Sequence, residues 1–292
     1  MLWALLLLLH LFFHNQIGAT RLRDVSTDSA LELALVNFHR YAGQSESTYV
    51  YAKPFYIHSV GGLLERSLAG VLFTGYKNLT HAIWLGINTA AMQAEIYDQK
   101  AGGLDDIQFK LGYDLLKLED AHGTLYLVGT APTGNRPCSC ICLPTVGTKN
   151  GSFGFGLDTQ AVAFEIKDCE LSLSIDLKYR YVFSSHEYQP VYSRIYPRGT
   201  IDVWIALNVP LYAWDVELGY DLWWLNKEKI ITAGQLCKKT ACALSQKIYL
   251  DVGYTAADIR LRPLIAVGAS YECAHTNALN QWMMWMTAGI TF

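Results

Sequence analysis

This sequence lacks a second apolar run long enough to cross a membrane as a helix. Its longest run covers residues 2–13 and is broken by His10, whereas a membrane-spanning helix needs about 20 apolar residues. Charge is also scarce, because only 17% of the 292 residues are charged and the net charge is −3. These shortages exclude a helical membrane protein. They also exclude a nucleic-acid partner, which calls for a basic surface.

Apolar residues are plentiful instead, at 51% of the chain, with 13% of all residues aromatic. This content excludes an intrinsically disordered chain, because such chains are poor in aromatic residues. Two fold classes remain. One is a β-rich soluble domain, and the other is a closed β-barrel that crosses a membrane with apolar residues at alternate positions.

The N-terminus indicates an exported protein. Residues 2–13 are followed by polar residues and then by Ile17-Gly18-Ala19, which suits signal-peptidase cleavage after Ala19. No Lys or Arg precedes Arg21, so the positive start of a typical signal peptide is missing, and a buried N-terminal helix is the alternative. We expect a signal peptide at 1–19 and a mature chain outside the cytoplasm.

The segment at 20–47 has helical features. Ser29 and Glu32 have the spacing of a capping box, and Leu31, Leu35 and Phe38 recur at helical intervals. A plug helix in or below a barrel, one more strand and a periplasmic tail all remain open. The expected domain order is therefore signal peptide, N-terminal periplasmic or plug segment, and a barrel at 48–292.

Strict alternation of apolar and polar residues begins at Leu171. Leu171 to Phe183 place Leu, Ile, Tyr and Phe on one face and Ser, Asp, Lys and Arg on the other. The same pattern recurs at 107–115, 201–209, 212–224, 248–254 and 259–271. Soluble strands run for about 5 or 6 residues and membrane strands for about 9 to 11. The length of the alternating segments and the aromatic residues near their ends favour membrane strands. In a membrane barrel the charged faces line a wet lumen.

The breaks between these strands alternate in length. Long breaks lie near 273–280, 226–246, 184–199 and 132–152, and short ones near 256–259, 209–211, 167–170 and 117–123. Outer-membrane barrels have short periplasmic turns and long extracellular loops. Further strands are expected near 106–117, 80–97, 64–75 and 48–58. We therefore predict an all-β, antiparallel up-and-down transmembrane barrel of about 12 strands, within a range of about 10 to 14.

The C-terminal strand alternates up to the last residue. Counting back from Phe292, apolar residues recur at Ile290, Ala288, Met286 and Met284. This resembles the C-terminal assembly signal of outer-membrane barrels. The resemblance implies outer-membrane lipid and the barrel-insertion machinery as partners.

Seven cysteines fit an oxidising compartment. The predicted topology places Cys169 in a periplasmic turn and six others on the outer side, namely Cys138, Cys140, Cys142, Cys237, Cys242 and Cys273. We expect disulfides among the outer six, with Cys237 to Cys242 as a local pair; the alternative is that all are reduced. The spacing of Cys138 to Cys142 does not match a zinc site, so we expect no metal and no cofactor.

Charged residues fall on the faces that would line the lumen. They are Lys110, Lys178, Arg180, Lys247, Arg260 and Arg262, against Asp114, Asp176, Asp202, Asp215, Glu217, Asp221, Asp251 and Glu272. This balance argues against strong ion selectivity. Our hypothesis for a lumen constriction comprises Arg260 and Arg262 on one strand, Asp215, Glu217 and Asp221 on another, and Lys178 and Arg180. The alternative is that these charges pair across strands as lumen packing.

Four short segments, in order along the chain, resemble a known family. The stretch from Gly103 to Tyr113, reading GLDDIQFKLGY, is followed by Leu125 to Thr130, by Ala131-Pro132-Thr133-Gly134-Asn135 and by the glycine-rich 151–157. Their order resembles the phenol-degradation meta-pathway outer-membrane proteins, which are similar to fatty-acid and aromatic-hydrocarbon channels. The resemblance implies a passive channel for small, mostly hydrophobic solutes. The chain is shorter than the fatty-acid channels and lacks an Asn-Pro-Ala hatch motif.

An enzyme would need a catalytic set at the barrel rim. Ser185-His186-Glu187 lies in an outer loop, but adjacent residues rarely form a triad, because its side chains must converge from separate elements. No nucleophile elbow, P-loop or zincin motif occurs, and we predict no enzymatic activity. The alternative to a channel is a structural or adhesive surface barrel that acts through its loops at 132–152 and 226–246.

Overall fold

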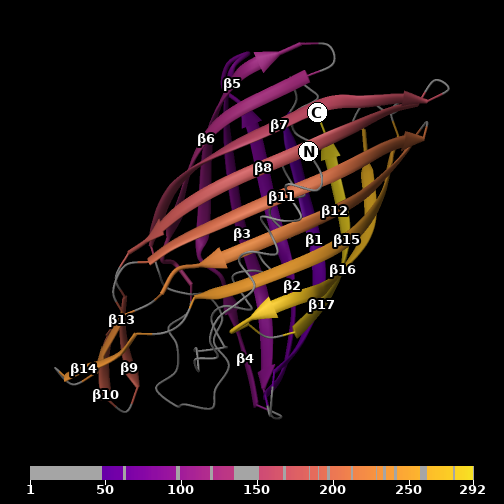
Figure 1. Cartoon of the computed structure of the whole chain (residues 1–292). Helices are drawn as coiled ribbons and strands as arrows, with labels where there is room; N and C mark the ends of the chain where they lie inside the picture. Colours follow the sequence, from indigo (N-terminus) through magenta and orange to yellow (C-terminus); the bar gives the residue numbers. More distant parts are fainter. Residues whose placement is uncertain are drawn as a thin grey trace.

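The computed structural model describes residues 48–61, 64–96, 99–118, 121–134, 151–166, 169–183, 185–189, 191–195, 198–211, 213–227, 229–232, 235–239, 242–256, 262–278 and 280–291. Within these ranges the regular structure is entirely β-strand, and most strands lie side by side in one curved wall (Figure 1). The described residues include no helix that is long and apolar enough to cross a membrane. The expected signal peptide and the segment at 20–47 lie outside the described residues.

The wall is built from long strands, and two further pairs of short strands lie beyond it. The wall strands are β1 (Tyr49–Gly61), β2 (Leu64–Asn78), β3 (Ile83–Ile96), β4 (Gln99–Leu104), β5 (Ile107–Lys117), β6 (Ala121–Ala131), β7 (Ser152–Ile166), β8 (Cys169–Val182), β11 (Arg198–Leu211), β12 (Trp214–Leu225), β15 (Ala243–Thr255), β16 (Leu264–Thr276) and β17 (Asn280–Thr291). The short strands are β9 (Ser185–Gln189), β10 (Val191–Ile195), β13 (Lys229–Thr232) and β14 (Gln235–Lys239).

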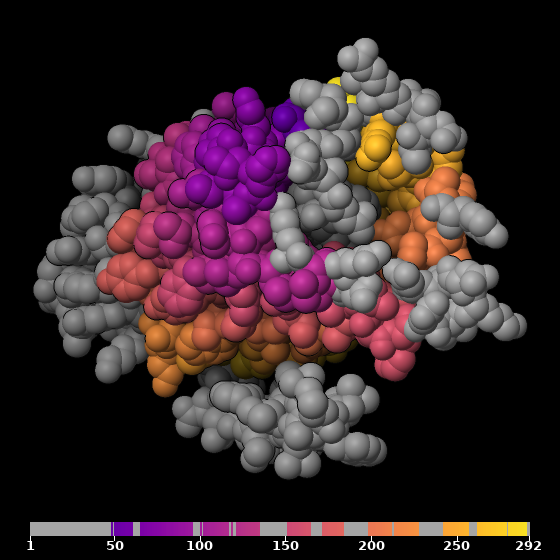
Figure 2. Space-filling model, turned by 90° about the horizontal axis from the view of Figure 1, so that it is seen from above, coloured from indigo at the N-terminus to yellow at the C-terminus, as the bar shows by residue number. Residues whose placement is uncertain are grey.

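The wall closes into a barrel. Its strands follow the order β2-β1-β17-β16-β15-β12-β11-β8-β7-β6-β5-β3-β4, and the pairing of β2 with β3 completes the ring. Figure 2 shows the same succession around one end, from indigo through magenta and orange to yellow. Every pairing in the ring is antiparallel.

Strands β4 and β5 occupy a single place in the ring. Both pair with β3, with β5 opposite Ile83–Asn88 and β4 opposite residues 91–96. The backbone N–H of Asp105, between the two strands, donates to the carbonyl of Ala90 at 2.7 Å. The described wall therefore has twelve strand positions, and the predicted all-β, antiparallel up-and-down barrel is confirmed.

Alternation along each strand separates an outer apolar face from an inner face. On β8, Leu173, Ile175 and Leu177 are 37–47% exposed, whereas Asp176 and Lys178 between them are at most 2% exposed. Apart from β4, the wall strands run from 11 to 15 residues, which is enough to cross a bilayer. The outer face is therefore the lipid-facing surface predicted from the sequence.

Long and short connections lie at opposite ends. The connections at 132–151, 183–197 and 226–242 leave one end, and those at 118–120, 167–168 and 212–213 leave the other. The first end is extracellular by the usual rule for such barrels. Strand β9 pairs with β10, β10 with β13 and β13 with β14, so two extracellular connections share one small sheet, at the lower left of Figure 1.

The predicted alternation of loop lengths fails at the C-terminal hairpin. The expected long break at 273–280 is a tight connection at 277–279, because β16 continues to Thr276 and Asn277 adopts a left-handed φ of 52°. The longer connection is at 256–263, where a short turn was predicted. The prediction was wrong here, and Cys273 belongs to a wall strand rather than to a loop.

Candidate functional site

The lumen is the candidate site, and one part of its wall carries buried charges. Lys178 on β8 faces Asp202 on β11, with Nζ 3.2 Å from Oδ2. Asp221 on β12 faces Lys247 on β15, with Oδ2 of Asp221 3.7 Å from Nζ of Lys247. Lys247 in turn faces Glu272 on β16. We call these five residues the charged arc. Lys178 compensates Asp202 and Lys247 compensates Asp221 where bulk water is excluded, while the two aspartates lie on the adjacent strands β11 and β12.

Four aromatic side chains on the inner wall lie flat over glycines of neighbouring strands. A Cβ added to the glycine would come within 2.0 to 2.3 Å of the ring, far inside van der Waals contact. The pairs are Trp84 over Gly112, Tyr126 over Gly156, Tyr249 over Gly219 and Trp285 over Gly268. Only a residue without a side chain leaves this space, so the glycines hold the rings against the wall.

Carboxylates fix three of these rings. The Tyr126 hydroxyl donates to Asp176 Oδ1 at 2.6 Å, and the Trp285 indole N–H donates to Asp251 Oδ2 at 2.5 Å. The Tyr249 hydroxyl donates to Glu217. Each bond pairs an amphipathic ring with a carboxylate oxygen, and hydrogen bonds to ionised carboxylates are a strong class. The acidic residues of the lumen therefore orient aromatic rings as well as balancing lysines.

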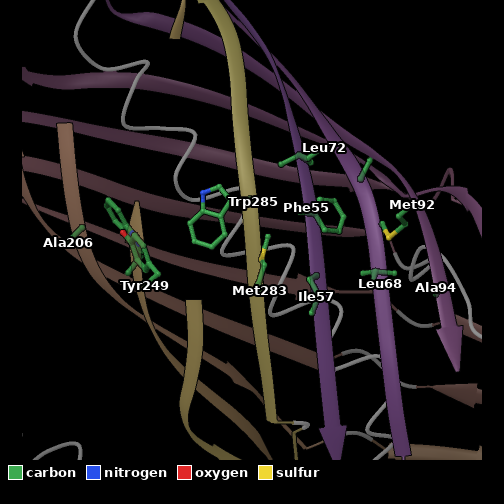
Figure 3. Close-up of a cluster of buried hydrophobic side chains, with 12 residues drawn as sticks. Phe55, Ile57, Leu68, Leu72, Met92, Ala94, Ala206, Tyr249, Met283 and Trp285 are labelled. Atoms are coloured by element: carbon green, nitrogen blue, oxygen red, sulfur yellow. The ribbon is translucent and has the colours of Figure 1, made fainter. Parts of the chain in front are cut away.

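The wall formed by β17, β1, β2 and β3 carries a cluster of apolar side chains on its inner face (Figure 3). Its buried side chains are Met283, Phe55, Ile57, Leu68, Leu72, Ala90, Met92 and Ala94, which we call the apolar arc. Trp285, Tyr249 and Trp204 continue the same cluster toward β11, and the rings of Trp204 and Tyr249 are stacked at 6.4 Å. The lumen thus has an apolar side and a charged side.

Two lysines of the inner wall lie over aromatic rings. Lys53 Nζ lies 5.7 Å from the ring centroid of Trp285, and Lys110 Nζ lies 5.2 Å from that of Tyr126. Both side chains are 1% exposed. Contact with the ring faces supplies cation–π stabilisation. These lysines bring positive charge to the border of the apolar arc.

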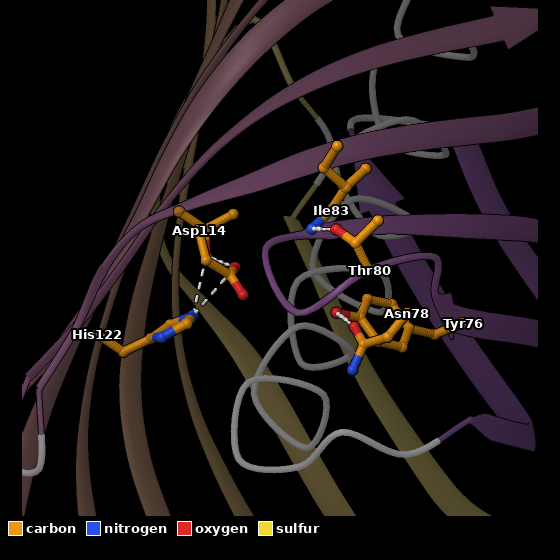
Figure 4. Close-up of polar contacts among 7 residues, drawn as sticks. Tyr76, Asn78, Thr80, Ile83, Asp114 and His122 are labelled. Atoms are coloured by element: carbon orange, nitrogen blue, oxygen red, sulfur yellow. Dashed lines mark hydrogen bonds and ion pairs between the residues drawn. The ribbon is translucent and has the colours of Figure 1, made fainter.

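Polar contacts cluster at the periplasmic end (Figure 4). The Thr124 hydroxyl donates to Asp114 Oδ1 at 2.8 Å and lies 2.9 Å from His122 Nε2, while His122 and Asp114 are 3.6 Å apart. Because the hydroxyl is directed at the carboxylate, this set does not have the nucleophile–base–acid order of a catalytic triad. The Tyr76 hydroxyl donates to Asn78 nearby. The contacts of Asp114 with His122 and Thr124 tie β5 to β6 at the rim, whereas the Tyr76–Asn78 bond lies within β2.

Most predicted constriction residues lie on the inner wall. Lys178, Arg180, Glu217 and Asp221 are buried there, and Asp215 is half-buried on the same face of β12. Whether they form the narrowest point of the lumen remains a prediction. The alternative expectation of cross-strand pairing holds for Lys178, which is bound to Asp202, and for Asp221, which is bound to Lys247.

Arg262 does not belong to the lumen wall. It precedes β16, is exposed and has a φ of 33°. The predicted strand from 259 was wrong at this point, because Pro263 removes a backbone donor and β16 starts only at Leu264. Arg260 lies outside the described residues.

The pattern missed three cations of the inner wall. Lys53, Arg66 and Arg198 are at most 5% exposed. Lys53 and Arg66 lie on β1 and β2, where much of the inner face is apolar and alternation gives little contrast. Arg198 opens β11 beside Pro197, where the sequence had indicated a loop. These cations could have been found from their spacing. Each lies an even number of residues from inner-face residues of its own strand.

The structure gives the thiol state of two of the six outer cysteines. Cys242 and Cys273 are free thiols, so the predicted Cys237 to Cys242 pair was wrong, as was a disulfide through Cys273. Cys273 Sγ donates to the carbonyl of Gln246 at 3.3 Å instead. The side chains of Cys138, Cys140, Cys142, Cys169 and Cys237 lie outside the described residues, and disulfides among them stay a prediction.

The Cys273 thiol predicts a simple labelling result. Because it is exposed on β16, N-ethylmaleimide should modify it in the folded barrel without prior reduction. Mass mapping of the peptide that contains Cys273 measures this, and Cys273→Ser is the matched blank. Full protection until a reductant is added would contradict a free thiol.

The motifs behind the family resemblance meet in space. The Asp106 carboxylate accepts the backbone N–H of Gly134 at 2.8 Å, and the Thr133 hydroxyl accepts the N–H of Ile107 at 3.0 Å. Asp106 is 7% exposed. The Gly-Leu-Asp-Asp and Pro-Thr-Gly segments therefore clamp the extracellular ends of β5 and β6 together.

Removing this clamp should lower stability measurably. Asp106→Ala leaves the Gly134 N–H without its charged acceptor, and hydrogen bonds to charged groups contribute about 1.5 to 3 kcal/mol. We expect a loss of that order in the free energy of unfolding, measured by urea titration in micelles. Asp106→Asn keeps an acceptor and should retain most of the stability; equal losses for both variants would contradict the clamp.

The closed wall, the apolar outer face and the lined lumen together define a transmembrane β-barrel of the outer-membrane type. No family model matches the sequence, and no curated protein sequence matches it. Among the described residues, no group of three or more His, Cys, Asp or Glu side chains is arranged to hold a metal ion.

Solved structures share the fold. An outer-membrane channel from Pseudomonas putida F1 has a TM-score of 0.62 at 9% identity, over 85% of this chain and 96% of that one. The translocator domain of the autotransporter NalP from Neisseria meningitidis has a TM-score of 0.53 at 10% identity, over 94% and 100%. The transport unit of the autotransporter AIDA-I from Escherichia coli has a TM-score of 0.52 at 8% identity, over 94% of this chain and 99% of that one. At these identities the likeness shows the barrel fold.

Proposed function

We propose that the protein is an outer-membrane channel for passive uptake of small hydrophobic or aromatic compounds, exported by its signal peptide. The observation that carries the proposal is the apolar arc, which lines a lumen that is usually polar in such barrels. Phe55, Leu72 and Met283 present hydrocarbon to the interior although the outer face already contacts lipid. A hydrophobic solute gains contacts there that a sugar or an ion does not.

The opposite wall supports the same proposal. Four residues of the charged arc form two ion pairs across strands, which weakens the field that they present to a neutral solute. Trp204, Tyr249 and Trp285 connect the two sides with ring faces, on which aromatic solutes stack favourably. The motif resemblance to the phenol-degradation outer-membrane family points to the same class of solute. The fold is shared with an outer-membrane channel from Pseudomonas putida F1.

Uptake by whole cells tests this proposal. The protein is expressed in a bacterium that lacks its own general outer-membrane channels, and entry of radiolabelled toluene and arabinose is measured. We expect toluene uptake to rise severalfold and arabinose uptake to change little. Equal rises would indicate a general porin, and no rise in either would contradict channel function.

A surface role is the second candidate. The observation in its favour is the sheet of β9, β10, β13 and β14, in which connections from two different hairpins pair beyond the barrel. An adhesive or structural barrel needs such an outer platform and no open lumen. Liposome swelling with the purified protein separates the two functions, because an adhesive barrel produces no solute flux.

A further inference from the structure

The lipid-facing surface has a hollow that the channel proposal does not use. A cavity of about 700 Å³ crosses the outer face of β3, β2, β1, β17 and the start of β16. Its floor contains the small residues Ala52, Gly75 and Ala288, and its sides include Phe73 and Ile265. A Cβ built on Gly75 meets no atom within 4 Å. The floor of the hollow is therefore open at Gly75. We call the hollow the wall groove.

The wall groove lies at the periplasmic end of the barrel. Val50 is the second residue of β1, Ile265 the second of β16, and Ile290 the second-last of β17. At about 3.3 Å per residue, each of these positions lies within one residue of the periplasmic end of its strand. The groove therefore opens to the hydrocarbon of the periplasmic leaflet, and its polar end faces that leaflet's headgroups.

Two cations flank the groove at that boundary. Arg262 is exposed and directly precedes Pro263, which lines the groove. Lys77 is exposed on the outer face of β2, two residues beyond Gly75 toward the periplasm. Within the part of the chain that the structure describes, neither side chain has an acidic partner. An apolar trough that ends between two unpaired cations is complementary to an acyl chain joined to an anionic phosphate.

We propose that the wall groove binds one phospholipid of the periplasmic leaflet, with an acyl chain along Ala52, Gly75 and Ala288 and its phosphate at Arg262 and Lys77. The volume lies within the range of sites for drug-sized ligands, which is enough for an acyl chain. A second copy of the chain fits less well, because a two-fold interface sets the groove against itself and leaves it unfilled. Lysine and arginine at a membrane surface attract anionic headgroups.

Native mass spectrometry of the full-length barrel tests the site. The protein is equilibrated with palmitoyl-oleoyl phosphatidylglycerol or with palmitoyl-oleoyl phosphatidylcholine, and the lipids retained per barrel are counted. We expect one retained phosphatidylglycerol, with a preference over phosphatidylcholine. Arg262→Gln and Lys77→Gln should each reduce that preference about fivefold. Lys227→Gln, an exposed lysine at the extracellular end, should leave it unchanged.

Filling the groove supplies the second arm. Gly75→Leu with Ala288→Leu should lower lipid retention at least about fivefold, whereas Ala269→Leu, on the outer face of β16 away from the groove, should not. Heat-modifiable migration on gels confirms that each variant is folded. Equal retention by filled and wild-type barrels overturns the site, and equal retention of the two lipids overturns the headgroup contact. A wild-type dimer that the filling abolishes identifies a second copy as the occupant instead.

Discussion

Gly219→Ala should destabilise the barrel by about 2 to 4 kcal/mol, the sum of overpacking and of a weakened bond to a charged acceptor. The new Cβ would lie 2.2 Å from the Tyr249 ring, so the ring must leave the wall and release Glu217. The free energy of unfolding in urea, measured on the barrel in lipid micelles, gives the loss directly.

Gly75→Ala is the matched control, because its Cβ enters open space. We expect its free energy of unfolding to stay within about 0.5 kcal/mol of wild type. Tyr249→Leu in the Gly219→Ala background should recover part of the loss, since no ring then competes with the methyl group. If Gly219→Ala and Gly75→Ala have the same unfolding midpoint, the ring does not depend on the glycine.

Lys178→Met should cost about 3 to 5 kcal/mol, because it leaves Asp202 buried without its cation. Both side chains are at most 4% exposed, and their charged atoms lie 3.2 Å apart. The double variant Lys178→Met with Asp202→Leu removes both charges at similar volume. It should unfold near the wild-type midpoint, since apolar replacement of a buried pair is often neutral.

A double-mutant cycle on these variants measures the coupling between the two charges. Lys178→Met, Asp202→Leu and the double variant are unfolded in urea under one condition. We expect the single losses to exceed the double loss by several kcal/mol. Additive losses would mean that Lys178 and Asp202 act independently and that the charged arc is not a coupled ladder.

The barrel could be predicted because alternation is strong on β8, β11, β12 and β15. There the outer face meets lipid and the inner face carries Lys178, Asp202 or Asp221, so each step along the strand changes environment. Alternation weakens on β1 to β3, where residues such as Phe55 and Ile57 make the inner face apolar as well. The weak signal in the first strands thus had a physical cause, and the same cause forms the apolar arc.

Features that depend on contacts between strands were beyond the sequence pattern. Nothing local shows that Gly219 lies beneath Tyr249 or that Asp106 reaches Gly134, because those pairs are set by register. The errors at Arg262 and Cys273 arose at strand ends, where one proline or one left-handed residue moves a boundary by several positions. Alternation along a strand was enough to predict which charged residues face the lumen. Which of them pair with each other could be known only from the register of neighbouring strands.

We expect apolar solutes to pass along the apolar arc, and uptake by cells that carry a variant of that arc shows whether they do. Leu72→Gln with Met283→Gln keeps side-chain volume but makes the inner wall of β2 and β17 polar. Ser174→Ala, on the opposite wall, is the control. With folding confirmed by heat-modifiable migration, toluene uptake by cells carrying the double variant should fall at least about fivefold, the equivalent of roughly 1 kcal/mol, while the control keeps its uptake. Unchanged toluene uptake by the double variant would mean that apolar solutes do not pass along the apolar arc.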